Sequence, residues 1–430
     1  MEDKNMLFEQ REIIDMLDRE MAALFVRRME AVRRVAEYKL ENGIPVFDPA
    51  REEQMIKKNS ERISEDIREL YADFLRGVTC VSKRYQSEII SARGGEIEVN
   101  IKGAPYKIVL GRGSLARAGE ILRLDRKVLI VTDKGVPSEY ANAIAAAAKE
   151  PTTVTLEGGE GCKSIASFEM LCRTMQKNGF TRTDCVVAVG GGVVGDLAGF
   201  AASAYMRGID FYNVPTTLLA QVDSSIGGKV AVNLDSVKNT VGAFYQPKCV
   251  LIDPNVLKTL PPRQISNGLA EALKMSLTSD RELFELFESG DANENIEKII
   301  ERSLMIKKRV VEEDEKESGV RKILNFGHTV GHGIESESFG KLYHGECVAL
   351  GMLPMCSDAV RARLLPVLGK LGLPTEAEFD RERAVAAMLH DKKLSGDEIT
   401  VTYVYEIGKY ELKKLPAEEF LKKVRESFKK

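Results

Sequence analysis

The sequence predicts a multidomain protein that combines an all-α part with an α/β part. Residues 5–90 carry helical periodicity and no strand-like alternation, with strong breaks only around 42–45 and 48–49. Between about 126 and 260, short β-rich runs alternate with helical stretches, which is typical of βαβ units and a mainly parallel sheet. Amphipathic helices dominate after Pro261-Pro262, except for a late hairpin predicted within ITVTYVYEIGKYEL. We therefore expect a three-helix domain (1–91), an α/β domain with a mainly parallel sheet (92–262) and a mostly α-helical domain (263–430).

Composition and charge exclude several classes of protein. The 430 residues are 44% hydrophobic and 30% charged, as in ordinary globular proteins, and the net charge of −3 gives no reason to expect nucleic acid as a partner. The first residues lack the pattern of a signal peptide, and no apolar run approaches the roughly 20 residues of a membrane span. Seven scattered cysteines without a CxxC pair favour a reducing compartment. We expect a cytoplasmic protein without membrane or nucleic-acid partners.

The first predicted helix carries a seam whose spacing alternates between three and four residues, as in a helix packed along a partner. Arg28 occupies a position in this seam where an apolar residue is expected. A guanidinium group there is costly unless it meets an anion. Two interpretations remain open at this point: Arg28 pairs with a glutamate or reaches solvent, or it binds an anionic ligand.

The α/β region carries signals for a dinucleotide. An apolar strand at 185–189 runs into Gly190-Gly191-Gly192 and then a helix, which satisfies GxGxxG in the required context. A tight strand-to-helix turn is the alternative interpretation. Asp133 ends another strand, where it could accept from a ribose hydroxyl or cap a helix. Polar residues that would be poor core material then follow among glycines: Arg207, Thr216, Thr217, Asp223, Lys229, Lys238 and Asn239.

Three of the four histidines, His328, His332 and His344, fall within 17 residues. His328 and His332 share one helical face at i, i+4, so spacing alone predicts both as metal ligands, with a packed or solvent-facing pair as the alternative. Glu271 is an acidic residue among apolar neighbours in the sequence. It is either a further candidate ligand or an ordinary exposed glutamate on a helix.

On these residues and motifs, residues 5–90 resemble the all-helical chorismate mutase family, and residues 95–430 resemble the 3-dehydroquinate synthase family. The resemblance implies two activities: chorismate to prephenate, and 3-deoxy-D-arabino-heptulosonate 7-phosphate to 3-dehydroquinate and phosphate with NAD and Zn²⁺ or Co²⁺. The chorismate residues that it implies are Arg11, Arg28, Lys39, Asp48, Glu52, Ser82 and Gln86.

The same resemblance assigns the residues of the second site. The implied NAD contacts are Asp133, Glu160, Lys163, Gly191, Gly192, Asp196, Thr216, Thr217 and Thr259, with Lys229 and Lys238 shared with the substrate. The implied metal ligands are Glu271, His328 and His344, whereas His332 moves to the substrate phosphate with Asn325. The remaining implied substrate residues are Asp223, Lys229, Lys238, Asn239, Lys274, Lys307, Glu317, Arg321 and Lys392 (favoured over Lys393), with Arg207 reaching the phosphate site of a neighbouring subunit.

The chemistry of both reactions suits these side chains. A Claisen rearrangement needs no nucleophile, so the first site works by holding one conformer and stabilising charge on the ether oxygen, to which Lys39 could donate. Glu52 would have to be protonated to do the same, or else it binds a substrate hydroxyl, as Asp48 could. In the second site the implied NAD oxidises C5 transiently and a metal polarises the C4 and C5 oxygens, while the substrate phosphate accepts the proton; His332 is a phosphate ligand or proton relay.

Arg11 and Arg28 are 17 residues apart, which is roughly 26 Å along one helix at about 1.5 Å per residue. Chorismate is much smaller, so if both arginines touch one ligand, Arg11 comes from a second chain. We therefore expect an intertwined homodimer.

Two departures from the families and three rival functions remain. Val237 stands where glycine is usual, and Pro354 and Pro366 interrupt a stretch expected to be helical. The rivals are another sugar-phosphate cyclase, a metal- and NAD-dependent polyol dehydrogenase, and an N-terminal module that only senses chorismate or prephenate.

Overall fold

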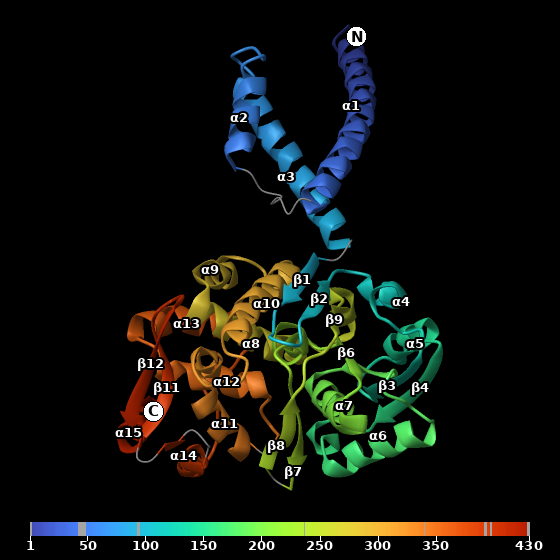
Figure 1. The fold of residues 1–430 in the computed structure, drawn as a ribbon. Helices are drawn as coiled ribbons and strands as arrows, with labels where there is room; N and C mark the ends of the chain where they lie inside the picture. The colour runs from blue at the N-terminus through green and yellow to red at the C-terminus, as the bar shows by residue number, and fades with distance from the viewer. Residues whose placement is uncertain are drawn as a thin grey trace. The chain divides into compact units, whose positions relative to one another are not determined.

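The computed structural model in Figure 1 describes residues 2–41, 49–92, 95–235, 237–338, 340–390, 394–395 and 398–427. The chain divides into two compact units, Met1–Gly95 and Glu96–Lys430. The predicted boundary between 262 and 263 falls inside the second unit, where helix α8 (Pro262–Ser279) begins. The three-domain division therefore stays a prediction. None of the described helices combines the length and the apolar character that crossing a membrane requires.

The described part of the N-terminal unit consists of the three predicted helices, α1 (Glu2–Glu41), α2 (Pro49–Ser60) and α3 (Arg68–Ala92). Both α1 and α2 pack against α3. Arg28 and Arg33 of α1 donate hydrogen bonds to Ser82 and Tyr85 of α3, so the C-terminal half of α1 is the half that α3 covers. The predicted turn between α1 and α2, which carries Asp48, lies outside the described residues.

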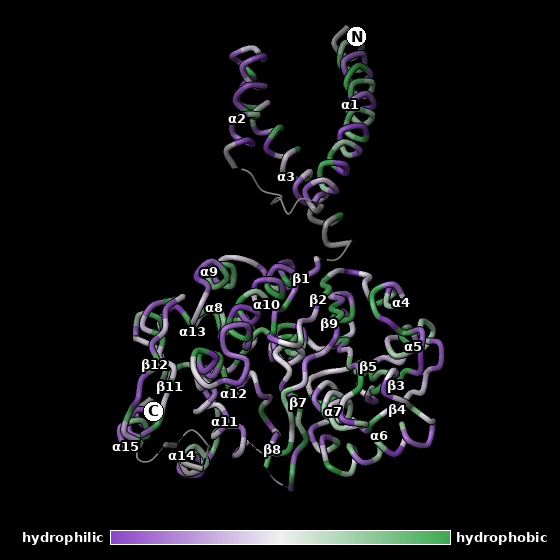
Figure 2. Tube along the Cα trace, in the orientation of Figure 1, coloured by the Kyte–Doolittle hydropathy of each residue, from purple (hydrophilic) through white to green (hydrophobic). Residues whose placement is uncertain are grey.

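The first half of α1 exposes its apolar seam. Figure 2 shows hydrophobic residues recurring along this helix, and Leu7 is 52%, Ile14 55% and Leu17 47% exposed. By contrast, Ala36 near the other end is completely buried. Over the described residues of this chain, the seam predicted from the heptad spacing therefore has no partner in its first half.

A mainly parallel sheet organises the first part of the second unit, as predicted. Its strands among the described residues are β1 (Gly95–Val99), β2 (Tyr106–Leu110), β3 (Lys127–Asp133), β4 (Glu150–Leu156), β5 (Cys185–Gly190), β6 (Asp210–Pro215) and β9 (Cys249–Ile252). They lie in the order β1-β2-β9-β6-β5-β3-β4, and every pairing from β2 to β4 is parallel. All residues of β5 are buried, which is why this strand reads as an uninterrupted apolar run.

Helices cover both faces of the sheet. On one face α4 (Ala118–Ile121) and α5 (Ser138–Ala147) share a core with the sheet, and on the other α6 (Ile165–Lys177) and α7 (Gly192–Ala204) do so. Because the strands are parallel, β3, β5, β6 and β9 all direct their carboxyl ends to one edge. In open α/β sheets this edge is where ligands bind.

An antiparallel hairpin of β7 (Lys229–Leu234) and β8 (Val237–Phe244) was not predicted. Most residues of β8 are exposed, so the segment lacks the alternation that marks a half-buried strand. Asn239 within it has φ 55, a left-handed conformation that interrupts regular strand geometry. The hairpin carries several of the predicted site residues.

Helices dominate the rest of the second unit, as predicted. They are α8, α9 (Arg281–Ser289), α10 (Ile296–Glu313), α11 (His328–Glu337), α12 (His344–Met352), α13 (Asp358–Lys370), α14 (Arg381–His390) and α15 (Ala417–Ser427). The predicted late hairpin is confirmed as β11 (Glu398–Glu406) paired antiparallel with β12 (Lys409–Pro416), next to the short β10 (Leu394–Ser395).

The two unexpected prolines are accommodated without loss of these helices. Helix α12 ends at Met352, and Pro354 lies in the short 3-10 turn η7 (Leu353–Met355) that follows it. Pro366 stands inside α13, where it removes one backbone donor, yet Leu364 and Leu368 on either side of it are fully buried. Burial of the apolar face keeps α13 intact.

Helices α11 and α12 approach each other closely through glycines. A Cβ atom on Gly351 would lie 2.1 Å from the carbonyl oxygen of Gly327, and one on Gly331 would lie 3.0 Å from that of Cys347. Neither position has room for a side chain. This close approach sets the distance between the histidines at the starts of the two helices.

Replacing Gly351 with alanine should therefore lower the free energy of unfolding by about 1–3 kcal/mol, the range for overpacking a tight core. Urea unfolding followed by circular dichroism measures this change. Gly369→Ala is the matched control, because a Cβ atom there meets nothing within 4 Å and alanine favours the helix. Equal stability of the two variants would contradict the close contact between α11 and α12.

Candidate active sites

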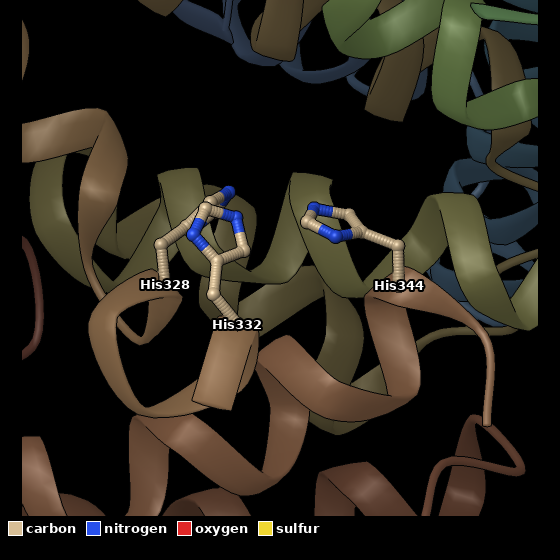
Figure 3. Close-up of side chains that lie close together, drawn as sticks. All are labelled: His328, His332 and His344. Carbon is tan, nitrogen blue, oxygen red and sulfur yellow. The ribbon is translucent and has the colours of Figure 1, made fainter. Parts of the chain in front are cut away.

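The second unit gathers its predicted metal ligands in one place. Glu271 lies on α8, His328 and His332 on the first two turns of α11, and His344 at the start of α12. Figure 3 shows the three rings directed toward one another, and one ligand atom from each of them lies within 4.8 Å of those of the other two. Glu271 Oε1 lies 3.6 Å from His328 Nε2 and 3.5 Å from His344 Nε2. Helices far apart in sequence thus converge on a four-residue cluster.

This donor set fits a divalent metal ion. Zinc binds nitrogen and carboxylate oxygen at about 2.0–2.1 Å in a tetrahedral arrangement, so two ligand atoms of one ion lie about 3.4 Å apart. The separations between Glu271 Oε1 and the two Nε2 atoms are close to this value. In addition, Glu271 is completely buried, and its Oε1 has no hydrogen-bond partner among the described residues. A buried carboxylate oxygen of this kind needs a cation to compensate for its lost hydration.

The electrostatics of the cluster favour a positive charge. Burial acts to raise the pKa of Glu271, but Lys274 and His344 outweigh it and lower the pKa to about 2. Burial acts to lower the pKa of His344, but the carboxylates of Glu271 and Glu335 raise it to about 10. Two carboxylates therefore stabilise a cation between them.

Contacts with α8 and within α12 fix the backbone at His344. Glu346 accepts hydrogen bonds from the backbone nitrogen of Tyr343 at 2.8 Å and from Arg263 at 2.7 Å, and Asn267 Oδ1 accepts one from the nitrogen of Gly345 at 2.6 Å. Arg263 and Asn267 belong to α8, the helix that also carries Glu271. The start of α12 is therefore held by the same helix that supplies the carboxylate.

Two buried lysines, on α8 and α10, make short polar contacts at or near this cluster. Lys274 is completely buried, and its Nζ lies 2.5 Å from Glu271 Oε2 and donates to the carbonyl oxygen of Leu324 at 2.6 Å. Lys307 is buried too and donates to Asp223 Oδ1 at 2.5 Å and to the backbone oxygen of Asp223 at 2.7 Å. Burial lowers the pKa of Lys307 to about 8, although Asp223 opposes the shift.

A second polar group joins the β7–β8 hairpin to the segment before α11. Glu317 accepts hydrogen bonds from Lys229 and from Asn325 Nδ2, the latter at 2.5 Å. Its backbone has φ 59, so the chain adopts a left-handed conformation to present this carboxylate. The buried Arg321 donates to the carbonyl oxygens of Gly227 and Glu315. Three of the predicted substrate residues, Lys229, Glu317 and Asn325, thus lie in linked contacts, and backbone carbonyls hold Arg321.

The predicted dinucleotide residues lie at the carboxyl edge of the sheet. Asp133 ends β3, Gly191 and Gly192 follow β5 at the start of α7, and Thr216 and Thr217 follow β6. These three strands are neighbours in the sheet. Cβ atoms on Gly191 and Gly192 would lie 3.1 Å from Thr217 and 2.9 Å from Ser224, so a side chain at either position would crowd a neighbouring side chain. Backbone amides at the start of a helix commonly bind an anion.

The remaining predicted cofactor residues surround this edge. Lys163 is buried and donates to Asp196 Oδ2 at 2.5 Å and to Asn239 of the hairpin. Burial raises the pKa of Asp196 to about 6, although Lys163 lowers it. Glu160 accepts a hydrogen bond at 2.8 Å from Asn233, which also belongs to the hairpin. Thr259, after β9, hydrogen-bonds the hydroxyl of Tyr140 at 2.9 Å. This donor set fits a dinucleotide along the edge of the sheet.

Some predicted residues are not joined to these groups. Arg207 is exposed and has φ 69, and no neighbouring subunit is present to test its predicted role. Lys392 and Lys393 lie outside the described residues, so neither the contact nor the preference between them is tested.

One carboxylate at the metal cluster was missed by sequence reasoning. Glu335 on α11 accepts from His344 Nδ1 at 2.9 Å and from Lys238 Nζ at 2.7 Å. Glu335 lies seven residues, or two helical turns, after His328, and this spacing could have placed it on the same face of the helix as that histidine.

The predicted chorismate residues of the N-terminal unit lie partly together. The half-buried Arg28 donates to Ser82, which is buried, and burial lowers the pKa of Arg28. Gln86 lies one turn further along α3, and its buried Oε1 has no hydrogen-bond partner in the described part of the chain. Arg28 therefore contacts the turn of α3 that carries Ser82 and Gln86. Arg11, by contrast, is exposed in the first half of α1, and Lys39 lies in the last turn of that helix.

Glu52 has neighbours that the sequence did not predict. Lys83 donates to it at 2.9 Å and Thr79 at 3.0 Å. The hydrogen bond from Lys83 is the main cause that lowers the pKa of Glu52.

Comparisons with known proteins agree with these geometries. The families 3-dehydroquinate synthase N-terminal, 3-dehydroquinate synthase C-terminal and chorismate mutase type II match residues 153–267, 268–394 and 10–87. A 3-dehydroquinate synthase of Streptococcus thermophilus is 43% identical over 347 residues, which cover 75% of this chain and 98% of the relative.

Two solved structures resemble the second unit. One is 2-deoxy-scyllo-inosose synthase complexed with carbaglucose-6-phosphate, NAD⁺ and Co²⁺, with TM-score 0.71 and 28% identity over 77% of this chain and 100% of that one. The other is 2-epi-5-epi-valiolone synthase from Streptomyces hygroscopicus subsp. jinggangensis with NAD⁺ and Zn²⁺ bound, with TM-score 0.69 and 27% identity over 76% of this chain and 98% of that one.

Proposed function

Since the chain belongs to the 3-dehydroquinate synthase family and carries a type II chorismate mutase domain before it, we infer that one polypeptide catalyses two reactions of aromatic biosynthesis. One converts 3-deoxy-D-arabino-heptulosonate 7-phosphate into 3-dehydroquinate and phosphate, and the other converts chorismate into prephenate. The observation that carries the first activity is the convergence of Glu271, His328 and His344 among buried lysines.

We propose that Glu271, His328 and His344 hold a zinc or cobalt ion, and that the carboxyl edge of the sheet holds NAD. NAD would supply transient oxidation at one substrate carbon, and the metal would polarise the substrate oxygens beside it. The buried orphan oxygen of Glu271 and the glycine turn before α7 support these two assignments. His332, exposed one turn after His328, is proposed to bind the substrate phosphate or relay a proton rather than to ligate the metal.

The cations hold the substrate by its charges. Lys274, Lys307 and Arg321 are buried, so their charges act in surroundings that screen them weakly. Lys229 and Lys238 come from the β7–β8 hairpin and pair with Glu317 and Glu335. We propose that the substrate carboxylate and phosphate bind these lysines together with Asn239, Asn325 and Arg321, and that Asp223 holds Lys307 in place by accepting its hydrogen bond. Holding the ends of the substrate fixes its reacting carbons and excludes water from them.

The pH dependence of phosphate release should reflect the protonation state of Lys307. Its pKa is lowered to about 8 by burial, so the ammonium is present below pH 8 and is lost as the pH rises through that value. We expect kcat/KM for phosphate release to be steady at neutral pH and to fall tenfold per pH unit above about pH 8.

The Lys307→Arg variant tests this assignment, because arginine keeps its proton throughout that range. In this variant, the fall of kcat/KM at alkaline pH should begin at a higher pH, even if the absolute rate is lower. The pH profile of chorismate conversion by the same protein serves as the control. An alkaline limb that stays in place in the variant would contradict the assignment.

The N-terminal unit is proposed to work as a homodimer. Arg28, Ser82 and Gln86 contribute from one chain, and Arg11 is proposed to reach the ligand from a second chain. The exposed apolar seam in the first half of α1 supports this assembly, because so much exposed apolar surface is unusual for a helix without a partner.

We place the protein in the cytoplasm, consistent with seven cysteines that form no disulfide.

One set of assays tests the proposed function against its rivals. The purified chain is given heptulosonate phosphate or sedoheptulose 7-phosphate, and phosphate and NADH are both followed. We expect phosphate release from the first substrate only, with no net NADH. Turnover of sedoheptulose 7-phosphate would favour another cyclase, and accumulation of NADH would favour a polyol dehydrogenase.

A further inference from the structure

Glu335 is shared between the metal cluster and the substrate-binding hairpin. One carboxylate oxygen, Oε2, accepts from His344 Nδ1 at 2.9 Å, and the other, Oε1, accepts from Lys238 Nζ at 2.7 Å. The side chain of Glu335 is 19% exposed, whereas that of Lys238 is 51% exposed. A single carboxylate on α11 therefore contacts α12 and β8 at once.

The contact with His344 selects one form of its ring. When His344 ligates a metal ion through Nε2, its imidazole is neutral and carries one N–H, and a carboxylate at Nδ1 holds that proton there. Nε2 then keeps its lone pair and lies 3.5 Å from Glu271 Oε1, on the side of the other ligands. Carboxylates that accept from the second nitrogen of a ligating histidine orient the ring and strengthen it as a ligand.

The contact with Lys238 ties the hairpin to the same helix. Lys238 stands next to Asn239, whose left-handed backbone places its side chain against Lys163. The pair between Lys238 and Glu335 joins β8 to α11, which also carries His328 and His332. The hairpin residues that we assign to the substrate are thereby linked to the histidines that we assign to the metal.

We propose that Glu335 is a positioning residue that orients His344 for the metal and holds the β7–β8 hairpin at the metal cluster through Lys238. This inference rests on the proposed role of His344 as a metal ligand. It predicts that loss of Glu335 weakens metal binding first and lowers activity as a consequence.

The test uses the full-length protein after removal of metal and compares wild type, Glu335→Ala, Glu335→Gln and Glu337→Gln. Glutamine keeps an acceptor for Nδ1–H and is expected to retain most of the affinity. Glu337 lies two residues on, about 200° around the helix, and is the matched control. Co²⁺ titration followed by visible absorbance should give an affinity about 10–100-fold lower for Glu335→Ala and unchanged for Glu337→Gln.

Activity measurements then distinguish a positioning role of Glu335 from a general loss of structure in the variant. At saturating Co²⁺, phosphate release by Glu335→Ala should recover most of its kcat, while KM for the heptulosonate stays raised because Lys238 is no longer held. Chorismate conversion in the same samples should match wild type. Equal Co²⁺ affinity of Glu335→Ala and wild type would overturn the inference while leaving the proposed function intact. A wild-type chain that binds no Co²⁺ would instead overturn the metal assignment and the inference together.

Discussion

The His328→Ala variant is expected to release phosphate from the heptulosonate about 10³-fold more slowly than wild type and to convert chorismate at the wild-type rate. A metal supplies several kcal/mol of charge stabilisation, and each 1.36 kcal/mol corresponds to about a tenfold change in rate. His328 is buried, and its Nε2 lies 3.6 Å from the orphan oxygen of Glu271. Removing the ring of His328 removes one of the three proposed metal ligands, so Glu271 and His344 alone would hold the ion.

His332→Ala is the informative companion, because the spacing of the histidines predicts both as ligands whereas the family resemblance assigns only His328. We expect His328→Ala to lose its bound metal and His332→Ala to keep one metal ion per chain while its KM for the substrate rises. Metal content by mass spectrometry and initial rates distinguish the two. If His332→Ala lost its metal and His328→Ala kept it, the assignment would be reversed.

The Arg28→Ala variant should convert chorismate about 10²–10³-fold more slowly, the range found when one preorganised donor to developing charge is removed. Arg28 is half-buried and held by its hydrogen bond to Ser82, so it is preorganised for an anion. Phosphate release by the other unit should not change.

Arg33→Ala is the control for this variant, because Arg33 is a nearby cation of α1 that donates to Tyr85 instead. Chorismate loss, followed by absorbance, should be normal there. If Arg28→Ala kept full mutase activity, or if it lost only a response of the synthase to chorismate or prephenate, the N-terminal unit would act as a sensor instead.

Much of the fold could be predicted because burial leaves a periodic trace in the sequence. Strand β5 is buried along its whole length and reads as an apolar run, and the helices after Pro262 carry an apolar face. The β7–β8 hairpin left no such trace, since β8 is mostly exposed and is held by polar contacts such as that of Lys238 with Glu335.

The candidate sites were predictable where residue types are scarce and their chemistry is distinctive. Histidines and a carboxylate among apolar neighbours indicate a metal, and α8, α11 and α12 do bring Glu271, His328 and His344 together. Glu335 and Lys83 could not be found in this way, because charged residues are common on helix surfaces. Only the fold reveals which of them face a histidine or a glutamate across helices.

The most direct test of the account is removal of the metal from the wild-type chain by a chelator, with phosphate release and chorismate loss measured on the same sample. We expect phosphate release to disappear and to return in proportion to added Zn²⁺ or Co²⁺, reaching its maximum at one ion per chain, while chorismate loss stays constant throughout. Full phosphate release from protein that retains far less than one metal ion per chain would contradict a metal-dependent centre built from Glu271, His328 and His344.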